Sequence, residues 1–584
     1  MEVPRPEHPR PDFQRSGWIN LNGPWQFEID RERKGMEHGY TSGSNLTKRI
    51  TIPFPPESRL SGVGERDFME SVWYRRKVKI PGEWRDSRTM LHFGAVDYES
   101  WAWVNGIPVG HHKGGYSSFE YDITTAVRET EEAEIVVRVL DDNRTGLQAC
   151  GKQSTEPESY GCHYTRVTGI WQTVWLEKVP TTYISHFRVA PDPASGRAFI
   201  AVNLGGPPAS GTLGVTVSRD GNEIAKSEVE LGMPSTCLSV GIPGPNMWSP
   251  EDPQLYGMKL ELSMRDGESD SVSSYFGIRS FELRGSKILL NGRPRFLRLV
   301  LDQGYYPDGI YTAPSDDALR NDILISKEMG FDGARLHQKV FEPRLLHWCD
   351  VLGYLVAGEY GDWGAEIENP STHESIMNEW TEVVLRDINH PSIVIWTPFN
   401  ERALGKAEGT VRDFLRDMVR LTRALDHTRP VIDTSGHMHV ETDIYDIHDY
   451  EQDPKEFRSH YERFGQTGIP SDLRRPEGDE SVPYQGQPFI VSEYGGTWWN
   501  PDAPADGRSW GYGERPASAE AFVERYRALT DVILSNPRAS GFCYTQLCDV
   551  EQEVNGLLTY ERRPKFSTKS IREVNSQRAA IESE

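Results

Sequence analysis

Two glutamates, each placed shortly after an apolar run, are the residues of this sequence best suited to chemistry. The run at 393–396 precedes Asn400 and Glu401, and the run at 489–492 precedes Glu493. Short apolar runs are typical of buried parallel strands, and the carboxyl ends of such strands carry the reactive groups of barrel enzymes. One carboxyl group can protonate a leaving oxygen while the other meets an electron-poor carbon. Cleavage of a glycosidic bond requires this division of roles.

The elements that must position these glutamates are short strands alternating with amphipathic helices. This pattern begins after residue 292 and predicts a (β/α)8 TIM barrel. The interval between Glu401 and Glu493 equals about three βα units of roughly 30 residues each, so both side chains are expected at one rim. The eight predicted strands are 296–300, 333–336, 354–357, 393–399, 430–434, 443–449, 489–492 and 541–546. Ser315 is predicted to cap the first helix and Gly330 to end it.

The residues before the barrel predict two all-β units, so the expected fold class is a multidomain α/β plus all-β protein. Up to residue 180, aromatic and β-branched runs alternate with Gly, Asn, Asp and Pro turns, as in a β-sandwich. A second set of alternating strands predicts a small immunoglobulin-like β-sandwich. The predicted boundaries are 1–180 and 181–280 for these units and 281–584 for the barrel.

The stretch 389–401 resembles the acid/base signature of glycoside hydrolase family 2, which contains β-galactosidases, β-glucuronidases and β-mannosidases. It reads Asn-His-Pro-Ser, three aliphatic residues, Trp, three residues and Asn-Glu. The stretch 488–496 resembles the nucleophile motif of the same family. The resemblance implies that Glu401 is the general acid/base, that Glu493 is the nucleophile and that Asn400 binds the sugar 2-hydroxyl. It also implies that residues 1–180 form a jelly roll of the sugar-binding type, whose loops can reach the active site.

Four more residues at the predicted rim are expected to bind substrate or support the nucleophile. Arg335 matches the barrel arginine that steadies the nucleophile in this family, and His337 follows two residues later. An arginine beside Glu493 would keep that carboxylate ionised. His448 and Tyr450 share one face of an extended strand, so one of them is expected to contact Glu493.

Three tryptophans and two polar residues complete the predicted pocket. Trp363, Trp498 and Trp499 are expected to wall it. Asp302 lies where familiar galactosidases and glucuronidases carry an Asn-x-His-Glu stretch, so the subsite for the distal sugar hydroxyls is predicted to be remodelled. Gln546 stands where relatives have a Trp-rich strand end, and hydrogen bonds are expected to replace that contact. The segment 553–556 offers no lysine where glucuronidases place one, so a glucuronidase is not predicted.

Two expectations concern carboxyl groups near the rim. Glu359 either corresponds to another acid of the relatives or pairs with a neighbouring base. The charge of Glu493 is expected to raise the pKa of Glu401, which would keep Glu401 protonated until the nucleophile has attacked.

The composition argues against several classes of protein. With 64 basic and 87 acidic residues the formal charge is −23, which repels nucleic acid and anionic membranes, so neither partner is expected. No apolar run reaches the roughly 18 residues of a membrane span and no signal-peptide core follows Met1, so a cytoplasmic location is expected. The six cysteines lack metal-binding spacing, so free thiols, no metal and no cofactor are predicted. A homo-oligomer stays open.

The sequence therefore predicts a retaining exo-glycosidase that hydrolyses terminal β-glycosides, is β-galactosidase-like and has a carbohydrate as its partner. One alternative is an exo-acting hydrolase of β-galacturonides, α-L-arabinofuranosides or β-galactofuranosides. A second is an endo-acting enzyme on polysaccharide. A third is an inactive carbohydrate-binding protein, against which both Glu401 and Glu493 speak, because a decayed enzyme usually loses one of the pair.

Overall fold

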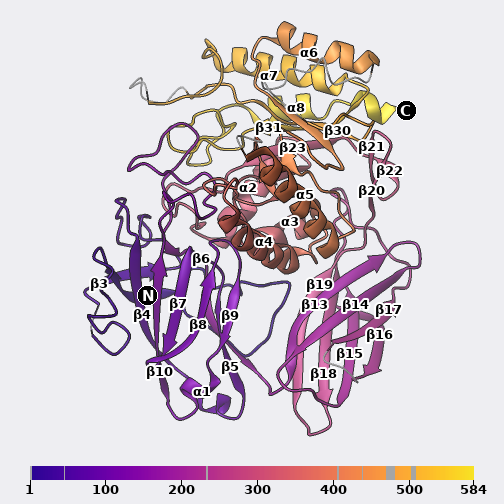
Figure 1. The fold of residues 1–584 in the computed structure, drawn as a ribbon. Coiled ribbons are helices and arrows are strands. Elements are labelled where there is room, and N and C mark those ends of the chain that lie inside the picture. The colour runs from indigo at the N-terminus through magenta and orange to yellow at the C-terminus, as the bar shows by residue number, and fades with distance from the viewer. Residues whose placement is uncertain are drawn as a thin grey trace.

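The chain folds into two β-sandwiches that lie side by side beneath a βα barrel (Figure 1). The computed structural model describes residues 3–44, 46–231, 235–403, 407–436, 438–467, 481–500 and 508–583. The predicted fold class, with a jelly roll, an immunoglobulin-like sandwich and a TIM barrel, is confirmed. No helix among the described residues is long and apolar enough to cross a membrane. All six cysteines are unpaired.

The N-terminal jelly roll packs two antiparallel sheets against each other. Its core holds alternate residues of each strand, as in β2, where Trp25 and Phe27 are buried and Gln26 is not. The six-stranded sheet has the order β3 (Lys48–Ile52), β2 (Gly23–Ile29), β4 (Ser71–Lys79), β10 (Glu132–Leu140), β7 (Glu99–Val104), β8 (Ile107–Lys113). The four-stranded sheet has the order β1 (Trp18–Asn20), β12 (Val174–Val179), β5 (Arg88–Phe93), β9 (Phe119–Asp122). Smaller elements are β6 (Val96–Asp97), β11 (Gly169–Ile170) and α1 (Thr124–Val127).

The second sandwich is built in the same way from longer strands. In β14, Ala198, Ile200 and Val202 are buried while Phe199 is exposed, which is the period of two that a half-buried strand requires. One sheet has the order β13 (Tyr183–Asp192), β14 (Arg197–Gly205), β17 (Ser235–Gly241). The other has the order β16 (Asn222–Glu230), β15 (Gly211–Arg219), β18 (Tyr256–Met264), β19 (Ser269–Phe276).

Seven parallel strands form the barrel sheet, and a short hairpin precedes them. The hairpin strands are β20 (Phe281–Arg284), β21 (Lys287–Leu290) and β22 (Arg293–Pro294). The parallel order is β26 (Ile393–Thr397), β25 (Leu355–Glu359), β24 (Gly333–Leu336), β23 (Leu297–Asp302), β31 (Ala539–Thr545), β30 (Phe489–Gly495), β29 (Tyr445–Asp449). Each of these seven overlaps a predicted strand.

The remaining predicted strand, 430–434, has a reduced ladder in the structure. A single bridge joins Val431 to Trp396, and the short β28 (Thr434–Ser435) pairs with β27 (Phe399–Asn400). Pro430 has no N–H to donate, and the N–H of Val431 is taken by the side chain of Asp443 at 2.8 Å. Neither residue can therefore donate a backbone hydrogen bond to a neighbouring strand, which explains why the predicted strand is broken.

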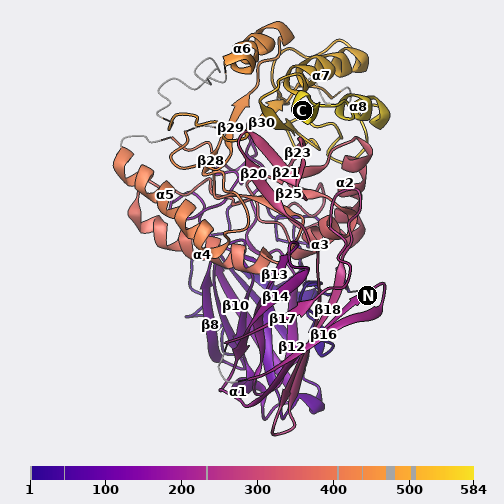
Figure 2. The same cartoon turned by 90° about the vertical axis from the view of Figure 1, so that its right-hand side faces the viewer.

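Seven longer helices of the described ranges surround the sheet, with α4 and α5 along one side of the barrel and α2 and α8 along the other (Figure 2). The helices are α2 (Asp316–Glu328), α3 (Pro343–Leu352), α4 (His373–Asp387), α5 (Glu408–Leu425), α6 (Pro454–Thr467), α7 (Ala519–Leu534) and α8 (Thr568–Asn575). Ser315 caps α2, because its side chain accepts a hydrogen bond from the N–H of Ala318 at 3.2 Å. Gly330 has a φ of +85° just after this helix, as the predicted end requires.

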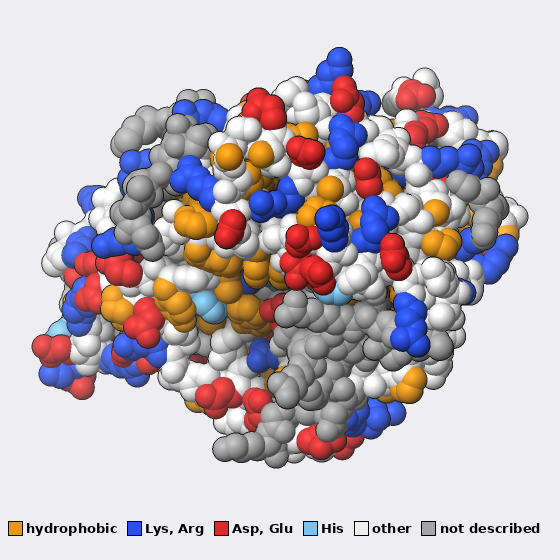
Figure 3. Space-filling view, turned by 90° about the horizontal axis from the view of Figure 1, so that it is seen from above, with side chains coloured by type: hydrophobic (Ala, Val, Ile, Leu, Met, Phe, Trp, Pro, Cys, Tyr) orange, Lys and Arg blue, Asp and Glu red, His pale blue; other side chains and the backbone are white. Residues whose placement is uncertain are grey.

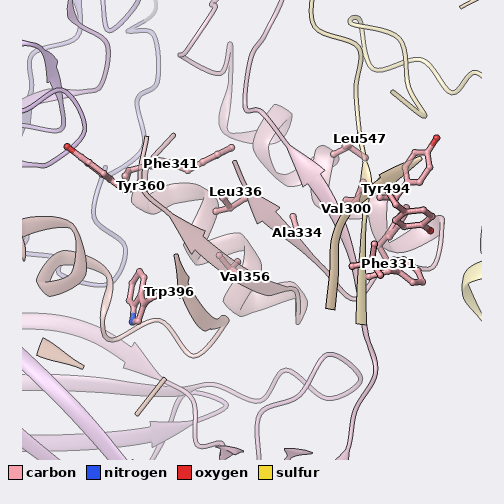
Figure 4. Packing of buried hydrophobic residues seen from close by; sticks show 14 of the residues in the cluster. Val300, Phe331, Ala334, Leu336, Phe341, Val356, Tyr360, Trp396, Tyr494 and Leu547 are labelled. Carbon is pink, nitrogen blue, oxygen red and sulfur yellow. The ribbon is translucent and has the colours of Figure 1, made fainter. Parts of the chain in front are cut away.

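Alternate residues of the barrel strands belong to two different cores. Val300, Ala334 and Val356 lie on neighbouring strands in the cluster that packs against the helices (Figure 4). Leu301 and Ala357 belong to a separate cluster together with the hairpin residues. Since successive side chains of a strand point to opposite faces, this second set lies inside the barrel. Strand parity therefore predicts which polar side chains near the rim face the lumen.

The N-terminal segment joins the jelly roll to the second sandwich through one buried arginine. Arg15 Nη1 lies 2.6 Å from Glu177 of β12, and Nη2 lies 2.9 Å from Asp270 of β19. Nη2 also donates to the carbonyl oxygen of Ile184 at 2.5 Å. All three charged side chains are at most 5 % exposed, so the charges stabilise one another rather than meeting solvent.

Replacing Arg15 with alanine is expected to destabilise the protein strongly, because two carboxylates would stay buried without their cation. Loss of one member of a buried ion pair costs about 3–5 kcal/mol. Urea unfolding of Arg15→Ala measures this cost. Arg284→Ala is the control, since Arg284 is 73 % exposed and its pairing with Glu282 is worth little. Equal stability of the two variants would contradict the role given to Arg15.

Candidate active site

The guanidinium of Arg335 connects the ends of several barrel strands. Arg335 lies on β24 and is 3 % exposed. Its Nε is 2.6 Å from Glu359 of β25, and its Nη1 is 2.8 Å from Glu493 of β30. Its Nη2 donates to Asn400 Oδ1 at 2.6 Å. Glu359 thus pairs with a neighbouring base, the second of its two predicted roles.

Glu493 is surrounded by groups that favour its ionised form. Besides Arg335, the hydroxyl of Tyr450 donates to Glu493 Oε2, and His448 Nε2 lies 3.3 Å from Oε1. Burial opposes ionisation, but the positive charges of His448 and Arg335 outweigh it and lower the pKa of Glu493 to about 2. Glu493 is therefore a carboxylate at any pH near neutrality. Both His448 and Tyr450 contact it, where the sequence led us to expect one.

Glu401 lies across from Glu493 and has a different environment. Its Oε1 is 2.6 Å from His448 Nδ1, and its N–H donates to the carbonyl oxygen of Ser435 at 3.0 Å. The side chain is 23 % exposed against 7 % for Glu493, so it has better access to water and to a leaving group. Glu401 has a φ of +49°, a left-handed conformation that a non-glycine residue adopts only where its surroundings impose it.

The distance between the two glutamates limits the chemistry. One carboxylate oxygen of Glu401, one of Glu493 and a ring nitrogen of His448 all lie within 4.8 Å of one another. Carboxyl pairs separated by roughly 5–5.5 Å leave no room for a water molecule at the back of the sugar, whereas inverting pairs are roughly 6.5–9.5 Å apart. The spacing fits direct attack by one of the two carboxylates.

Asn400 presents one buried donor with nothing bound to it. Its Oδ1 accepts from Arg335, its N–H donates to Asp362 Oδ1 at 3.1 Å and its carbonyl oxygen accepts from Trp363 Nε1 at 3.1 Å. Its Nδ2 is buried and has no hydrogen-bond partner among the residues that the structure describes. Because an unsatisfied buried amide group costs about 1–3 kcal/mol, this atom suits a ligand hydroxyl. The ring of Trp363 is held beside that position.

The contacts of four other residues predicted to bind substrate or wall the pocket, His337, Gln546, Trp498 and Trp499, are as follows. His337 Nδ1 is 2.9 Å from Glu359, and burial lowers the pKa of His337 well below its usual value, so it is neutral. Gln546 Nε2 donates to Asn555 Oδ1 at 2.7 Å, and its buried Oε1 has no partner in the described part of the chain. Trp498, which follows β30, is half-buried, and its backbone N–H donates to the carbonyl oxygen of Tyr512 at 3.2 Å. Trp499 is buried, and its backbone N–H donates to the carbonyl oxygen of Val554 at 3.0 Å.

Asp302, predicted to bind substrate, is turned away from the cluster. Its carboxylate accepts from the N–H of Gly304 at 2.9 Å, and burial and Asp322 raise its pKa to about 6. Asp302 has the strand parity of Val300, which packs toward the helices. The prediction ignored this parity. Asp322 of α2 is an electrostatic neighbour of the Asp302 carboxylate, and the carbonyl oxygen of Asp302 accepts from the N–H of His337 at 2.9 Å.

The part of the site that the sequence did not reveal comes from the jelly roll. The N–H of Cys150 donates to the carbonyl of Trp363 at 2.7 Å, which holds residues 150–152 against the barrel rim. Lys152 Nζ lies 4.1 Å from the centroid of the Trp363 ring. Tyr164 donates to Glu553 Oε2 at 2.6 Å. No local sequence signal marks these residues, because only the docking of the two units brings them to the rim.

The three side chains Glu401, His448 and Glu493 are also the group, among the described residues, whose donor atoms lie close enough together to ligate a metal ion. The guanidinium of Arg335, 2.8 Å from Glu493, already supplies the positive charge that an ion would bring. The ring nitrogens of His448 face Glu401 on one side and Arg335 and Glu493 on the other. This donor set suits an acid, a base and their partners better than a metal.

Comparison with known families gives the same three units. Residues 19–180 match the sugar binding domain, residues 182–279 a further domain and residues 281–579 the TIM barrel domain of glycosyl hydrolases family 2. A β-glucuronidase of Paenibacillus borealis is 24% identical over 445 residues, covering 70% of this chain and 72% of the relative.

Two solved structures have the same fold. A β-glucuronidase from Ruminococcus gnavus in complex with D-glucuronic acid has a TM-score of 0.79 and 19% identity, covering 99% of this chain and 100% of the other. A β-galacturonidase from Eisenbergiella tayi bound to glycerol has a TM-score of 0.76 and 20% identity, covering 98% of each chain.

Removing the hydroxyl of Tyr450 is expected to make Glu493 easier to protonate. The hydroxyl bonds the charged form of the carboxylate, so its loss raises the pKa of Glu493. Activity that needs ionised Glu493 is then lost at a higher pH on the acid side in Tyr450→Phe than in the unaltered protein. The pH profile of kcat/KM measures this shift.

The control is Tyr512→Phe, which removes a hydroxyl from the ring stacked on Tyr450 at 3.7 Å. In this variant, kcat/KM should fall on the acid side at the same pH as in the unaltered protein. An unmoved acid limb in Tyr450→Phe, or a movement to lower pH, would contradict the stabilisation of Glu493 by Tyr450.

Proposed function

We propose that this chain, which belongs to glycoside hydrolase family 2, is a retaining exo-glycosidase that releases terminal β-linked sugars by double displacement. The observation that carries the proposal is the carboxylate pair. Glu401 and Glu493 have oxygens within 4.8 Å of each other, and their environments differ in exposure and in partners. Such a pair supports one ionised nucleophile and one proton donor.

In the first step Glu493 attacks the anomeric carbon and forms a covalent bond to the sugar. Its low pKa, a result of the charges of His448 and Arg335, keeps it ionised for this attack. Glu401 gives its proton to the oxygen of the departing group, so the bond to the leaving group breaks as the bond to Glu493 forms. The greater exposure of Glu401 fits its position beside the leaving group.

In the second step water replaces the leaving group. Glu401, now a carboxylate, removes a proton from the water as the water oxygen attacks the anomeric carbon, and Glu493 is released as a carboxylate. Two inversions leave the anomeric configuration unchanged. Throughout, Asn400 Nδ2 offers its unpaired donor to the sugar 2-hydroxyl, and Arg335 holds Oδ1 of the same amide.

Exo action is favoured by the jelly-roll residues at the barrel rim. Cys150, Gly151 and Tyr164 are hydrogen-bonded to Trp363, Gly361 and Glu553, so the jelly roll covers one side of the barrel rim. A blocked side suits the end of a sugar chain better than its middle. An inactive binding protein would not need an arginine, a tyrosine and a histidine around one ionised carboxylate.

Replacing Glu401 with alanine tests the acid/base role. Without its proton donor, the enzyme should cleave glycosides with poorly activated leaving groups about 1,000-fold more slowly, whereas nitrophenyl glycosides should lose far less in the first step. Added azide should restore turnover of the nitrophenyl substrate, because it needs no general base to attack the glycosyl-enzyme.

The control for this experiment is Glu524→Ala, which removes an exposed glutamate from the outer helix α7. It should leave both substrates unaffected. Equal slowing of both substrate types in Glu401→Ala, together with no effect of azide, would refute the assignment of Glu401.

A further inference from the structure

Lys152 is a buried cation at the rim for which the described residues provide no carboxylate partner. Its side chain crosses from the jelly roll to the barrel, and the residue is 7 % exposed. Among the described residues no acidic oxygen lies within 4 Å of its ammonium, whereas the other two cations beside the cluster are paired. Arg335 lies 2.8 Å from Glu493, and Arg402 Nε lies 2.5 Å from Asp362.

The backbone fixes Lys152 in this place. The N–H groups of Cys150 and Gly151 bond the carbonyls of Trp363 and Gly361 at 2.7 Å and 3.0 Å, and the carbonyl of Lys152 accepts from the N–H of Tyr164 at 2.8 Å. The lysine is thus held on both sides by ordered structure. Long cationic side chains normally keep their heads in bulk water, so the position of Lys152 has a cost that some partner should offset.

The described partners of Lys152 do not include an anionic oxygen that accepts a hydrogen bond from its ammonium group. The Trp363 ring, 4.1 Å from Nζ, gives a cation–π contact, and the thiol of Cys162 is a weak acceptor. An ammonium has three donors and favours an anionic oxygen. The carboxylates that favour this charge, Glu553, Glu493 and Glu401, act from beyond 4 Å among the described residues, so a direct anionic contact is left for a ligand.

The lysine is charged, and it is the cation of this wall. Burial lowers its pKa, but Cys162, Glu553, Glu493 and Glu401 together raise the pKa above its usual value. Burial lowers the pKa of its neighbour His163 to about 4, with Lys152 as a further cause, so His163 is neutral near pH 7. Trp363 connects Lys152 to the reacting centre, because its indole N–H is bonded to Asn400.

We propose that Lys152 binds a carboxylate of the substrate and makes this enzyme selective for acidic glycosides, of which hexuronides are the simplest class. This rests on the proposed function and adds the substrate class to it. The segment 553–556 has no lysine, which argues against the familiar glucuronidase arrangement but leaves other uronides open. A cation from a different unit removes that argument, because recognition requires the charge at the rim and not its origin in the barrel.

Pairs of nitrophenyl glycosides that differ only at C6 test the proposal. The unaltered enzyme should cleave a β-hexuronide better than the hexoside of the same configuration. In Lys152→Met, kcat/KM for the uronide should fall by about 100-fold, while the value for the neutral hexoside changes only a few-fold. Lys152→Arg, which keeps the charge, should recover part of the loss. Lys113→Met is the matched control, since Lys113 is an exposed lysine of the same unit.

A third substrate, a neutral hexoside with a carboxylated aglycone, identifies the source of the carboxylate. A loss confined to the uronide places the carboxylate on the released sugar, and a loss confined to the third substrate places it on the leaving group. Both outcomes support recognition of a substrate carboxylate. An equal loss on all three substrates, or no loss on any, would overturn it.

Binding separates this inference from the proposed function. Calorimetry with Glu493→Gln compares glucuronate and galacturonate with glucose and galactose, and it needs no turnover. If the acid sugars bind more tightly and Lys152→Met in the same background abolishes the difference, the lysine site stands even if no glycoside is cleaved. If the acid sugars bind no better than the neutral ones, or equally well without Lys152, the inference fails even if hydrolysis is retained.

Discussion

The site depends on one buried cation, the guanidinium of Arg335. It contacts Glu359, Glu493 and Asn400, which come from three different strands, and each contact is 2.8 Å or shorter. A buried charge must be paired, so the guanidinium and the carboxylates fix one another's positions. Two consequences follow for the chemistry. Glu493 is kept ionised, and the amide of Asn400 is held with a nitrogen that no described residue pairs. The proposed mechanism uses the first for attack and the second for the sugar 2-hydroxyl. The planar fork of arginine suits this arrangement better than the point charge of lysine.

The active site belongs to two units of the chain. The barrel supplies the reacting groups, and the jelly roll supplies a wall containing Lys152, His163 and Tyr164, which packs against Trp363 and Glu553. Charged side chains of both signs are spread over the barrel end of the molecule, so the net charge of −23 is not gathered there (Figure 3).

Much of this architecture was predictable because the relevant signals are local. Apolar runs that end in Glu401 and Glu493, and a helix start at Ser315, depend on residues close in sequence. The local sequence signal was not sufficient where a side-chain partner lies outside the element itself. Val431 loses its ladder bond to the side chain of Asp443, and Lys152 reaches the rim only through the docking of the jelly roll. The parity of Asp302 with Val300 is visible in the sequence and does not favour its predicted contact with substrate, which stays a prediction. The boundaries after residues 180 and 280 and the cytoplasmic location stay predictions.

The central claim is that Glu493 forms the covalent bond to the sugar while Glu401 handles the proton. A 2-deoxy-2-fluoro glycoside with a good leaving group tests it most directly, because fluorine slows breakdown of the glycosyl-enzyme more than a good leaving group slows its formation. Mass spectrometry of the digested protein then locates the label. The account predicts one fluorosugar attached to Glu493. A label on Glu359 or Asp449, or a product of inverted configuration, would contradict it.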